Sequence, residues 1–230
     1  WSGLAERRAR AAHWVEDYAR FIAIKHAHGG ACWADWPEPL RQREPAALAA
    51  FVQHHLDEIE AVVREQYACA QWWGRVRGVA KARGIELLGD MPLFVAHDSA
   101  DVWAHPERFL LDDAGWPGVV TGVPPDYFSE TGQRWGNPHY NWAAMRADGY
   151  LWWRQRLCAH FDCFDLVRID HFRGFAAAWT IPATEPTAIH GHWVDAPGDE
   201  LLEALARECN GLSLVAEDLG VITPDVVALR

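Results

Sequence analysis

The chain has 230 residues, 50% of them hydrophobic, with 21 Lys and Arg against 32 Asp and Glu, a formal net charge of −11. This composition is typical of a globular protein. The negative charge, with no run of Lys or Arg to offset it, argues against nucleic acid as a partner. Every apolar run is shorter than the roughly 18 residues that a membrane span needs, so we expect no membrane partner.

The first helical segment is predicted from Leu4 to His26, where apolar residues recur at helical spacing among charged ones. Gly29 and Gly30 should end this helix. The stretch from Cys32 to Glu44 contains two prolines and is expected to be a loop.

A second helical period runs from Pro45 to Arg83, and we expect it to break near His55 or Gly74. Residues 1–84 are therefore predicted to form a helical lead-in, inserted into a larger α/β unit.

Three strands are predicted after the lead-in, and each of them follows a helix. The first is Ile85 to Val95. Helix Ala143 to Phe161 leads into strand Phe164 to Asp170, and helix Asp199 to Asn210 leads into strand Leu212 to Glu217. This alternation is typical of parallel βα units, and we expect an α/β fold with about three strands of a (β/α)8 TIM barrel.

Residues 115–142 lie between the first two of these units, within a barrel segment expected to cover residues 85–230. They are rich in Pro and Gly and have neither a helical nor a strand period. Loops of this length are usually functional or disordered. Aromatic residues argue against disorder, so we predict an ordered lid over a site. These aromatics are Tyr127, Phe128, Trp135, Tyr140 and Trp142.

The ends of the chain suggest a piece of a longer protein. The sequence begins at Trp1 without a methionine, and it stops at Arg230 shortly after Thr223-Pro224-Asp225, which is a typical helix start. Five scattered cysteines without a C-x-x-C pair predict buried free thiols in a reducing compartment, and hence a cytoplasmic protein. They are Cys32, Cys69, Cys158, Cys163 and Cys209.

Charged residues end two of the predicted strands. Alternate side chains of a strand share a face, so Arg168 and Asp170 should point together, and the next strand ends in Glu217 and Asp218. Acids at the carboxyl ends of successive strands are how α/β barrels build active sites. Paired carboxylates are also the working groups of glycoside chemistry.

Different surroundings should separate the roles of Asp170 and Glu217 if they face each other across a sugar. The guanidinium of Arg168 would keep Asp170 charged, as a nucleophile must be. Glu217 has no cation nearby in the sequence, and burial would keep it protonated, as a general acid must be. The alternatives are a structural Arg–Asp pair and a solvated helix start. Asp90 and Asp98 could bind substrate or cap a turn.

Twelve histidines raise the question of a metal, but none of their pairs has the spacing of a zinc signature. The motifs of serine hydrolases and P-loop proteins are also missing, and we expect no metal and no cofactor. Most of the 14 tryptophans should cover the core, whereas Trp103 and Trp135 are candidates for stacking on a ligand.

Four segments together resemble the amylomaltases, the 4-α-glucanotransferases or disproportionating enzymes of glycoside hydrolase family 77. They are Gly89 to Trp103, Gly122 to Pro138, Arg168 to Gly174, and Ala216 to Gly220, with a weaker resemblance through the lead-in. The resemblance implies an interrupted (β/α)8 barrel of the α-amylase clan. It also implies a retaining enzyme that transfers segments of maltooligosaccharides and α-1,4-glucans.

The same resemblance assigns roles to residues. Asp170 would be the nucleophile, Glu217 the acid/base, and a third acid would lie on a strand after Arg230. Arg168 would contact the nucleophile and the sugar, and His171 a donor-site hydroxyl. The lid residues next to the glucan would be Tyr127, Phe128, Trp135 and Asn137. A hydrolase of the same clan remains an alternative, as does an inactive glucan-binding piece for the isolated chain.

Overall fold

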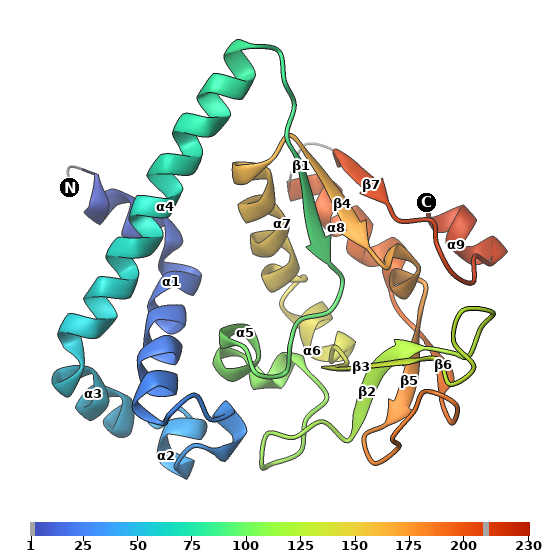
Figure 1. Ribbon diagram of the computed structural model, residues 1–230, viewed down its shortest axis with the longest axis horizontal. Helices are drawn as coiled ribbons and strands as arrows, with labels where there is room; N and C mark the ends of the chain where they lie inside the picture. Colours follow the sequence, from blue (N-terminus) through green and yellow to red (C-terminus); the bar gives the residue numbers. More distant parts are fainter. Residues whose placement is uncertain (1–2, 209–211) are drawn as a thin grey trace.

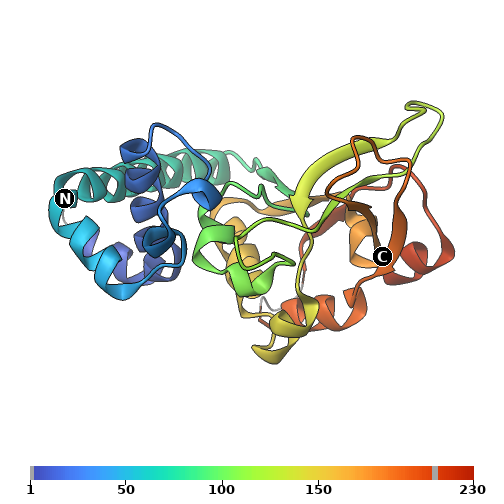
Figure 2. The ribbon, with the colours of Figure 1, turned by 90° about the horizontal axis from the view of Figure 1, so that it is seen from below.

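The computed structural model describes residues 3–208 and 212–230. The helices of residues 4–82 gather at one end, and the two sheets lie at the other with the later helices beside them (Figures 1 and 2). Helix α1 (Leu4–Ala27) agrees with the prediction, and the second helical segment breaks at His55 into α3 (Pro45–His54) and α4 (Leu56–Ala82), with no break at Gly74.

Helices α1 and α4 lie side by side (Figure 1). Their apolar faces meet in a small core made of Val15, Ala19, Ala23, Ile59, Val62 and Val63. The expected loop between α1 and α3 is wrong in part, because it contains a 3-10 helix (Trp33–Asp35) and the short helix α2 (Glu38–Arg41). Proline explains the local start of α2, since Pro39 occupies its first turn, where no intrahelical N–H is needed.

Three parallel strands form the first sheet, in the order β1-β4-β7. They are β1 (Leu88–Pro92), β4 (Leu166–Asp170) and β7 (Leu214–Ala216). β1 is three residues shorter than predicted at each end and β7 two and one, whereas β4 begins two residues later than predicted and ends at Asp170 as predicted. Val167 and Ile169 are buried on one face of β4, which leaves Arg168 and Asp170 on the other, as expected.

Helices precede these strands as predicted, but the one expected from Ala143 to Phe161 is interrupted. It consists of α6 (Trp142–Ala147) and α7 (Leu151–Cys163). Gly149 has φ +67° and Tyr150 has φ +59°, and the amide of Tyr150 donates to the carbonyl of Met145 at 2.7 Å. A glycine in the left-handed region ends a helix in this way.

Helix α8 (Gly198–Glu208) precedes β7, and the predicted end of this helix at Asn210 lies outside the described residues. Helix α9 (Pro224–Leu229) begins after Thr223, as the sequence predicted. The short helix α5 (Ala100–Ala104) and the 3-10 helices Pro106–Arg108 and Phe172–Phe175 complete the helical elements of the described part.

A second sheet was not expected. Its antiparallel strands follow the order β3-β2-β5-β6. They are β2 (Val119–Val123), β3 (Gln133–Pro138), β5 (Ala177–Pro182) and β6 (His192–Asp195). The expectation that residues 115–142 lack regular structure is therefore wrong for β2 and β3. Gly and Pro within them, and a register irregularity between Val120 and Gly122, hide the alternation that marks a strand.

Gly122 allows β2 and β3 to approach closely. A methyl group at this position would lie 2.2 Å from the backbone oxygen of Gln133. We expect Gly122→Ala to lower the free energy of unfolding by about 1–3 kcal/mol, because the two strands must move apart. Gly118→Ala is the matched control, since its methyl group meets nothing within 4 Å. Urea denaturation of the full-length protein measures both, and equal losses of stability would contradict the packing.

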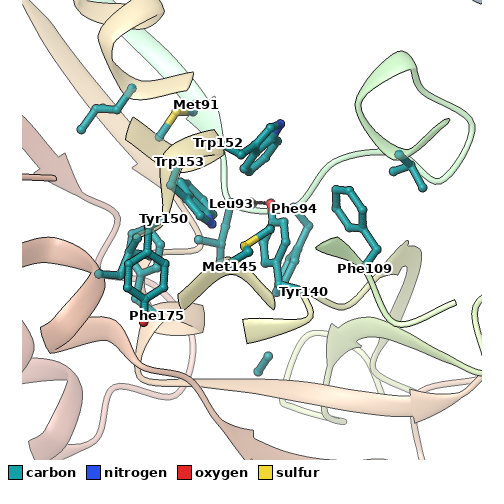
Figure 3. Close-up of a cluster of buried hydrophobic side chains, with 14 of the residues drawn as sticks. Met91, Leu93, Phe94, Phe109, Tyr140, Met145, Tyr150, Trp152, Trp153 and Phe175 are labelled. Carbon is teal, nitrogen blue, oxygen red and sulfur yellow. Dashed lines mark hydrogen bonds between the residues drawn. The ribbon is translucent and has the colours of Figure 1, made fainter. Parts of the chain in front are cut away.

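The main core packs α6 and α7 against the parallel sheet and extends to α1 and α8. Figure 3 shows its aromatic rings gathered around Leu93 and Phe94, just after β1. Tyr140 donates its hydroxyl to the carbonyl of Leu93 at 2.6 Å, so this buried phenol has a partner. Trp103 is fully buried and donates to the carbonyl of Leu40, so the expectation that it stacks on a ligand is wrong. The burial of Trp103 has a simple cause, since a large aromatic ring removes much apolar area from water when it packs in the core.

Four cysteines lie in the described part, and none of them forms a disulfide there: Cys32, Cys69, Cys158 and Cys163. The expectation of buried thiols is wrong for Cys69, which is exposed on α4, and the other three are half-buried. Cys209 lies outside the described residues. Within residues 3–208 and 212–230, no helix has the length and apolar character that crossing a bilayer requires.

Candidate active site at the carboxyl ends of the parallel strands

Parallel pairing brings three acids to one edge of the first sheet. Asp90 on β1 lies opposite Arg168 on β4, and Pro92 lies opposite Asp170. Glu217 follows β7, and its amide donates to the carbonyl of Ile169 at 3.1 Å. Parallel strands deliver their carboxyl ends to the same edge, which is where α/β folds place functional groups.

Arg168 holds these acids together. Its Nη1 is 2.7 Å from Oδ1 of Asp90, and its Nη2 is 2.9 Å from both Oδ1 of Asp170 and Oε1 of Glu217. The pKa of Arg168 is raised above its ordinary value, chiefly by the hydrogen bond to Asp90 and further by Asp170. One guanidinium thus offsets the repulsion among three carboxylates.

The shared nitrogen limits how far apart the two candidate catalytic acids can be. Oδ1 of Asp170 and Oε1 of Glu217 each lie 2.9 Å from Nη2 of Arg168, so these oxygens are at most 5.8 Å apart. Retaining glycosidases place their two carboxyl groups about 5–5.5 Å apart, and inverting ones about 6.5–9.5 Å apart. The limit on these two oxygens lies below the inverting range and is compatible with the retaining arrangement.

Glu217 has no cation nearby in the sequence, but the structure places one beside it. Arg168 pairs with Glu217 as well as with Asp170, because the register places Ile169 opposite Ala216. The guanidinium alone therefore does not distinguish the two acids. Their exposure does: the side chain of Asp170 is 46% exposed, and that of Glu217 only 16%. Asp170 is the more open of the two to a ligand at this edge.

His171 supplies a second contact to Glu217 through its backbone. The residue adopts φ +58° and ψ +46°, the left-handed region that non-glycine residues seldom enter, and its amide donates to Oε2 of Glu217 at 2.6 Å. Its imidazole Nε2 is buried without a hydrogen-bond partner in the described part of the chain. Backbone strain at such a position is typical of functional sites.

Burial keeps the imidazole of His171 uncharged at neutral pH. It lowers the pKa from 6.5 to about 4, with a further lowering by Arg173 and an opposing effect of Asp170. The unfolded chain therefore binds this proton near pH 6.5, whereas the folded protein does so only near pH 4. Stability from this group is full above pH 6.5 and is lost as the pH falls to about 4.

We expect His171→Asn to make the melting temperature fall less steeply between pH 6.5 and 4. Asn has no group that titrates there, and it tolerates the left-handed conformation. Melting curves of the full-length protein across this range measure the effect. His13→Asn, at an exposed position on α1, is the control, and a fall equal to that of the wild type in His171→Asn would contradict the prediction.

The hairpin of β2 and β3 brings Trp135 to the same place. The indole meets the imidazole of His171 edge-on, with ring centroids 4.7 Å apart and an interplanar angle of 90°. Asn137 lies farther along β3 and donates to the carbonyl of Val95 at 2.9 Å. The structure thus places Trp135 beside the acids, and it gives Asn137 a bracing contact with the segment after β1.

Tyr127 and Phe128 lie at the tip of this hairpin. They are 98% and 91% exposed, and their rings meet edge-on at 5.7 Å. The carboxylate of Asp126 accepts hydrogen bonds from the amides of Phe128 and Ser129, which fixes the turn. Two adjacent aromatic rings are thus left in contact with water. Exposed apolar patches of this kind are typical of binding sites.

Asp98 is not part of this group in the described structure. Its carboxylate pairs with Lys25 of α1 and accepts from the amide of Trp33. These contacts favour the structural alternative, in which Asp98 links the lead-in to the segment after β1. Asp90, by contrast, faces Arg168 directly.

Two arginines near the site were not singled out from the sequence. Arg156 on α7 donates to the carbonyls of Pro92 and Leu93 and so supports the end of β1. Arg173 is buried over the ring of Trp193 at 3.7 Å. The signal for Arg173 was its place in the charged segment after β4, whereas nothing local marks Arg156. The described residues contain no group of three or more His, Cys, Asp or Glu placed to hold a metal.

Fold and site together define an α/β protein with a cluster of carboxylates around one guanidinium at the carboxyl edge of a parallel sheet. A family model described as 4-alpha-glucanotransferase, of glycoside hydrolase family 77, matches residues 3–230. The chain belongs to this family.

Curated relatives carry the same description. The chain is 53% identical over 223 residues to the 4-alpha-glucanotransferase of Thermus thermophilus, covering 97% of this chain and 45% of that protein. It is 48% identical to the chloroplastic/amyloplastic enzyme of Solanum tuberosum, covering 94% and 38%. The chain thus spans less than half the length of these relatives.

Solved structures of amylomaltases agree with this family membership. The amylomaltase of Streptococcus agalactiae in complex with acarbose matches with a TM-score of 0.94 and 36% identity, over 98% of this chain and 46% of that one. The amylomaltase of Corynebacterium glutamicum matches with a TM-score of 0.74 over 100% of this chain and 30% of that one. At 21% identity, the second match concerns the fold alone.

Proposed function

We propose that the full-length protein is a 4-α-glucanotransferase that transfers α-1,4-glucan segments to the 4-hydroxyl of an acceptor glucan or glucose. The observation that carries this proposal is the pair of carboxylates held within 5.8 Å by one nitrogen of Arg168, in a chain of this family. The acarbose complex of the S. agalactiae amylomaltase supports α-glucans and maltooligosaccharides as ligands.

In the first step Glu217 protonates the glycosidic oxygen while Asp170 attacks the anomeric carbon. The glycosidic bond breaks, the shortened glucan leaves as an alcohol, and a glycosyl ester forms on Asp170. In the second step the carboxylate of Glu217 takes the proton of an acceptor 4-hydroxyl, whose oxygen displaces Asp170. Two inversions retain the α configuration.

The surrounding residues are assigned to glucan binding. Arg168 orients both acids. His171 is assigned to a sugar hydroxyl, which its buried Nε2 can meet only after the neighbouring ring of Trp135 moves. Trp135, together with Tyr127 and Phe128 at the hairpin tip, would cover the sugar and exclude water, which favours transfer. Asn137 would act indirectly, by holding the hairpin in place. Asp90 would also act indirectly, by holding Arg168. The contacts of Asp98 support a structural role instead.

The larger architecture also belongs to the proposal. The parallel sheet would be three strands of an interrupted (β/α)8 barrel, with residues 1–84 as a helical subdomain and residues 85–230 as the barrel segment. The lid would be residues 115–142, built on β2 and β3. Four cysteines that form no disulfide in the described part support a reducing compartment such as the cytoplasm.

Maltotriose separates transfer from the runner-up, hydrolysis by the same two acids. Incubated with the full-length protein, it should give glucose together with maltopentaose and longer chains. Glucose and maltose alone would identify a hydrolase, in which water replaces the acceptor hydroxyl. Unchanged maltotriose would leave only glucan binding.

A further inference from the structure

A second candidate binding surface lies among the helices. Two cavities, of about 260 Å³ and 730 Å³, open between α1 and α7. The first is bounded also by α5 and the second by α4. They share His13, Trp14, Gln155 and Ala159 in their walls, so they form one continuous cleft. We call it the α1–α7 cleft. None of the three acids at the sheet edge lines it.

An exposed aromatic ring marks the junction of the two cavities. The side chain of Trp14 is 40% exposed, and its ring is held edge-on by Tyr18, with centroids 6.1 Å apart. Trp152 lines one cavity and Trp73 the other. Apolar aromatic walls with a few polar groups are typical of small-molecule sites, and flat rings suit the C–H faces of sugars.

Polar groups that could bind hydroxyls also face the cleft. Within the described part of the chain, no hydrogen bond engages the imidazole of His13, the hydroxyl of Tyr18 or the amide of Gln155. Each of these groups can both donate and accept. Sugar hydroxyls have the same property.

Most fixed charges around the cleft are already compensated. Arg8 pairs with Glu16 and Glu60, and Arg154 pairs with Glu208. Arg10 pairs with Glu6, and Asp17 pairs with Arg20 and Arg43. The remaining charges in the walls balance in number, since Arg7 and Arg156 are matched by Asp101 and Asp162. Ion pairs that already exist leave little net charge for an ionic ligand, so a neutral polyhydroxy ligand fits best.

We propose that the α1–α7 cleft binds a second segment of an α-1,4-glucan, away from the catalytic edge. This inference rests on the proposed function, which supplies the ligand class. Arg156 lines the cleft and also supports the end of β1. A glucan bound in the cleft would therefore contact a residue that packs against the same parallel sheet as the acids. Anchoring one part of a long glucan raises the local concentration of the rest at the active site.

Calorimetric titration of the full-length protein with maltoheptaose tests the cleft directly. Asp170→Asn is used as background, so that the ligand is not consumed, and it should show two classes of site. Adding Trp14→Ala or Gln155→Leu should remove one class. The matched control is Trp72→Ala, because Trp72 is 65% exposed on α4 but does not line the cleft. Each variant must melt as its parent does. Gln155→Leu keeps the test valid if Trp14→Ala changes the position of Tyr18, which contacts the Trp14 ring.

A kinetic measurement separates this inference from the proposed function. With Asp170 intact, Trp14→Ala should raise KM for amylose about fivefold or more and leave transfer from maltotriose within about twofold of the wild type. A single class of site in Asp170→Asn, or two classes that remain after both substitutions, would contradict glucan binding in the cleft. Transfer from maltotriose by the wild type would in that case still support the proposed function. Absence of both transfer and glucan binding in the wild type would overturn both.

Discussion

Asp170→Asn in the full-length protein should reduce transfer from maltotriose by roughly four to six orders of magnitude, the scale of losing a covalent nucleophile. An amide does not attack the anomeric carbon, so no glycosyl ester forms. Asn has the shape of Asp, and its oxygen can still accept from Nη2 of Arg168, which lies 2.9 Å from Oδ1 of Asp170. Glucan binding should therefore remain largely intact.

The control for this substitution is Asp165→Asn. Asp165 is a carboxylate just before the other end of β4, paired with Arg77, and it lies outside the cluster around Arg168. Its replacement should leave the rate of transfer close to that of the wild type. Initial rates of glucose release measure both variants, and near-normal activity of Asp170→Asn would contradict its role as nucleophile.

Glu217→Gln should lower transfer from maltotriose by roughly two to four orders of magnitude, because a sugar leaving group requires a proton. A donor whose leaving group needs no proton should bypass the first of its two tasks. With α-maltosyl fluoride as donor, we expect Glu217→Gln to release fluoride in an initial burst and then to stall for lack of a general base.

Fluoride release from the two variants distinguishes the two acids. Asp170→Asn should give no burst with the same donor, since it cannot form the glycosyl ester. If Glu217→Gln lost activity with maltotriose and with the fluoride to the same extent, its role as acid/base would be wrong.

Local sequence signals were sufficient for the longest helices, α1 and α4, and for the parallel strands. The apolar period of α1 and the proline after Thr223 at the start of α9 depend only on neighbouring residues. The strand ends were predictable because charged residues directly follow a buried run, as in β4, where Val167 and Ile169 are buried. Gly149, which divides α6 from α7, is a typical helix stop signal, so this interruption was also predictable from the sequence.

The antiparallel sheet was harder to predict, because its strands lack alternation. Gly122 and Pro138 interrupt the hairpin, and β5 is buried on both faces for most of its length. A strand of that kind is stabilised by partners far away in the sequence, such as β2, which pairs with β5 through Thr121 and Thr180. No short window of the sequence contains that information.

The acids themselves were predictable, but the contacts between them were not. Arg168 and Glu217 are far apart in the chain, and only the register of β4 and β7 brings them together. The amide of His171 reaches Glu217 because of a left-handed backbone conformation that the residue type does not predict. Sequence thus predicted which residues meet at the sheet edge, and the structure added how one guanidinium and one amide hold them.

A covalent glycosyl ester on Asp170 is the most direct test of the proposed mechanism. Full-length Glu217→Gln, incubated with α-maltosyl fluoride and digested at low pH, can be analysed by mass spectrometry of its peptides. We predict a maltosyl adduct on the peptide that contains Asp170, with the site assigned by fragmentation. An adduct on another carboxylate, such as Asp90, or no adduct during a burst of fluoride, would contradict the mechanism.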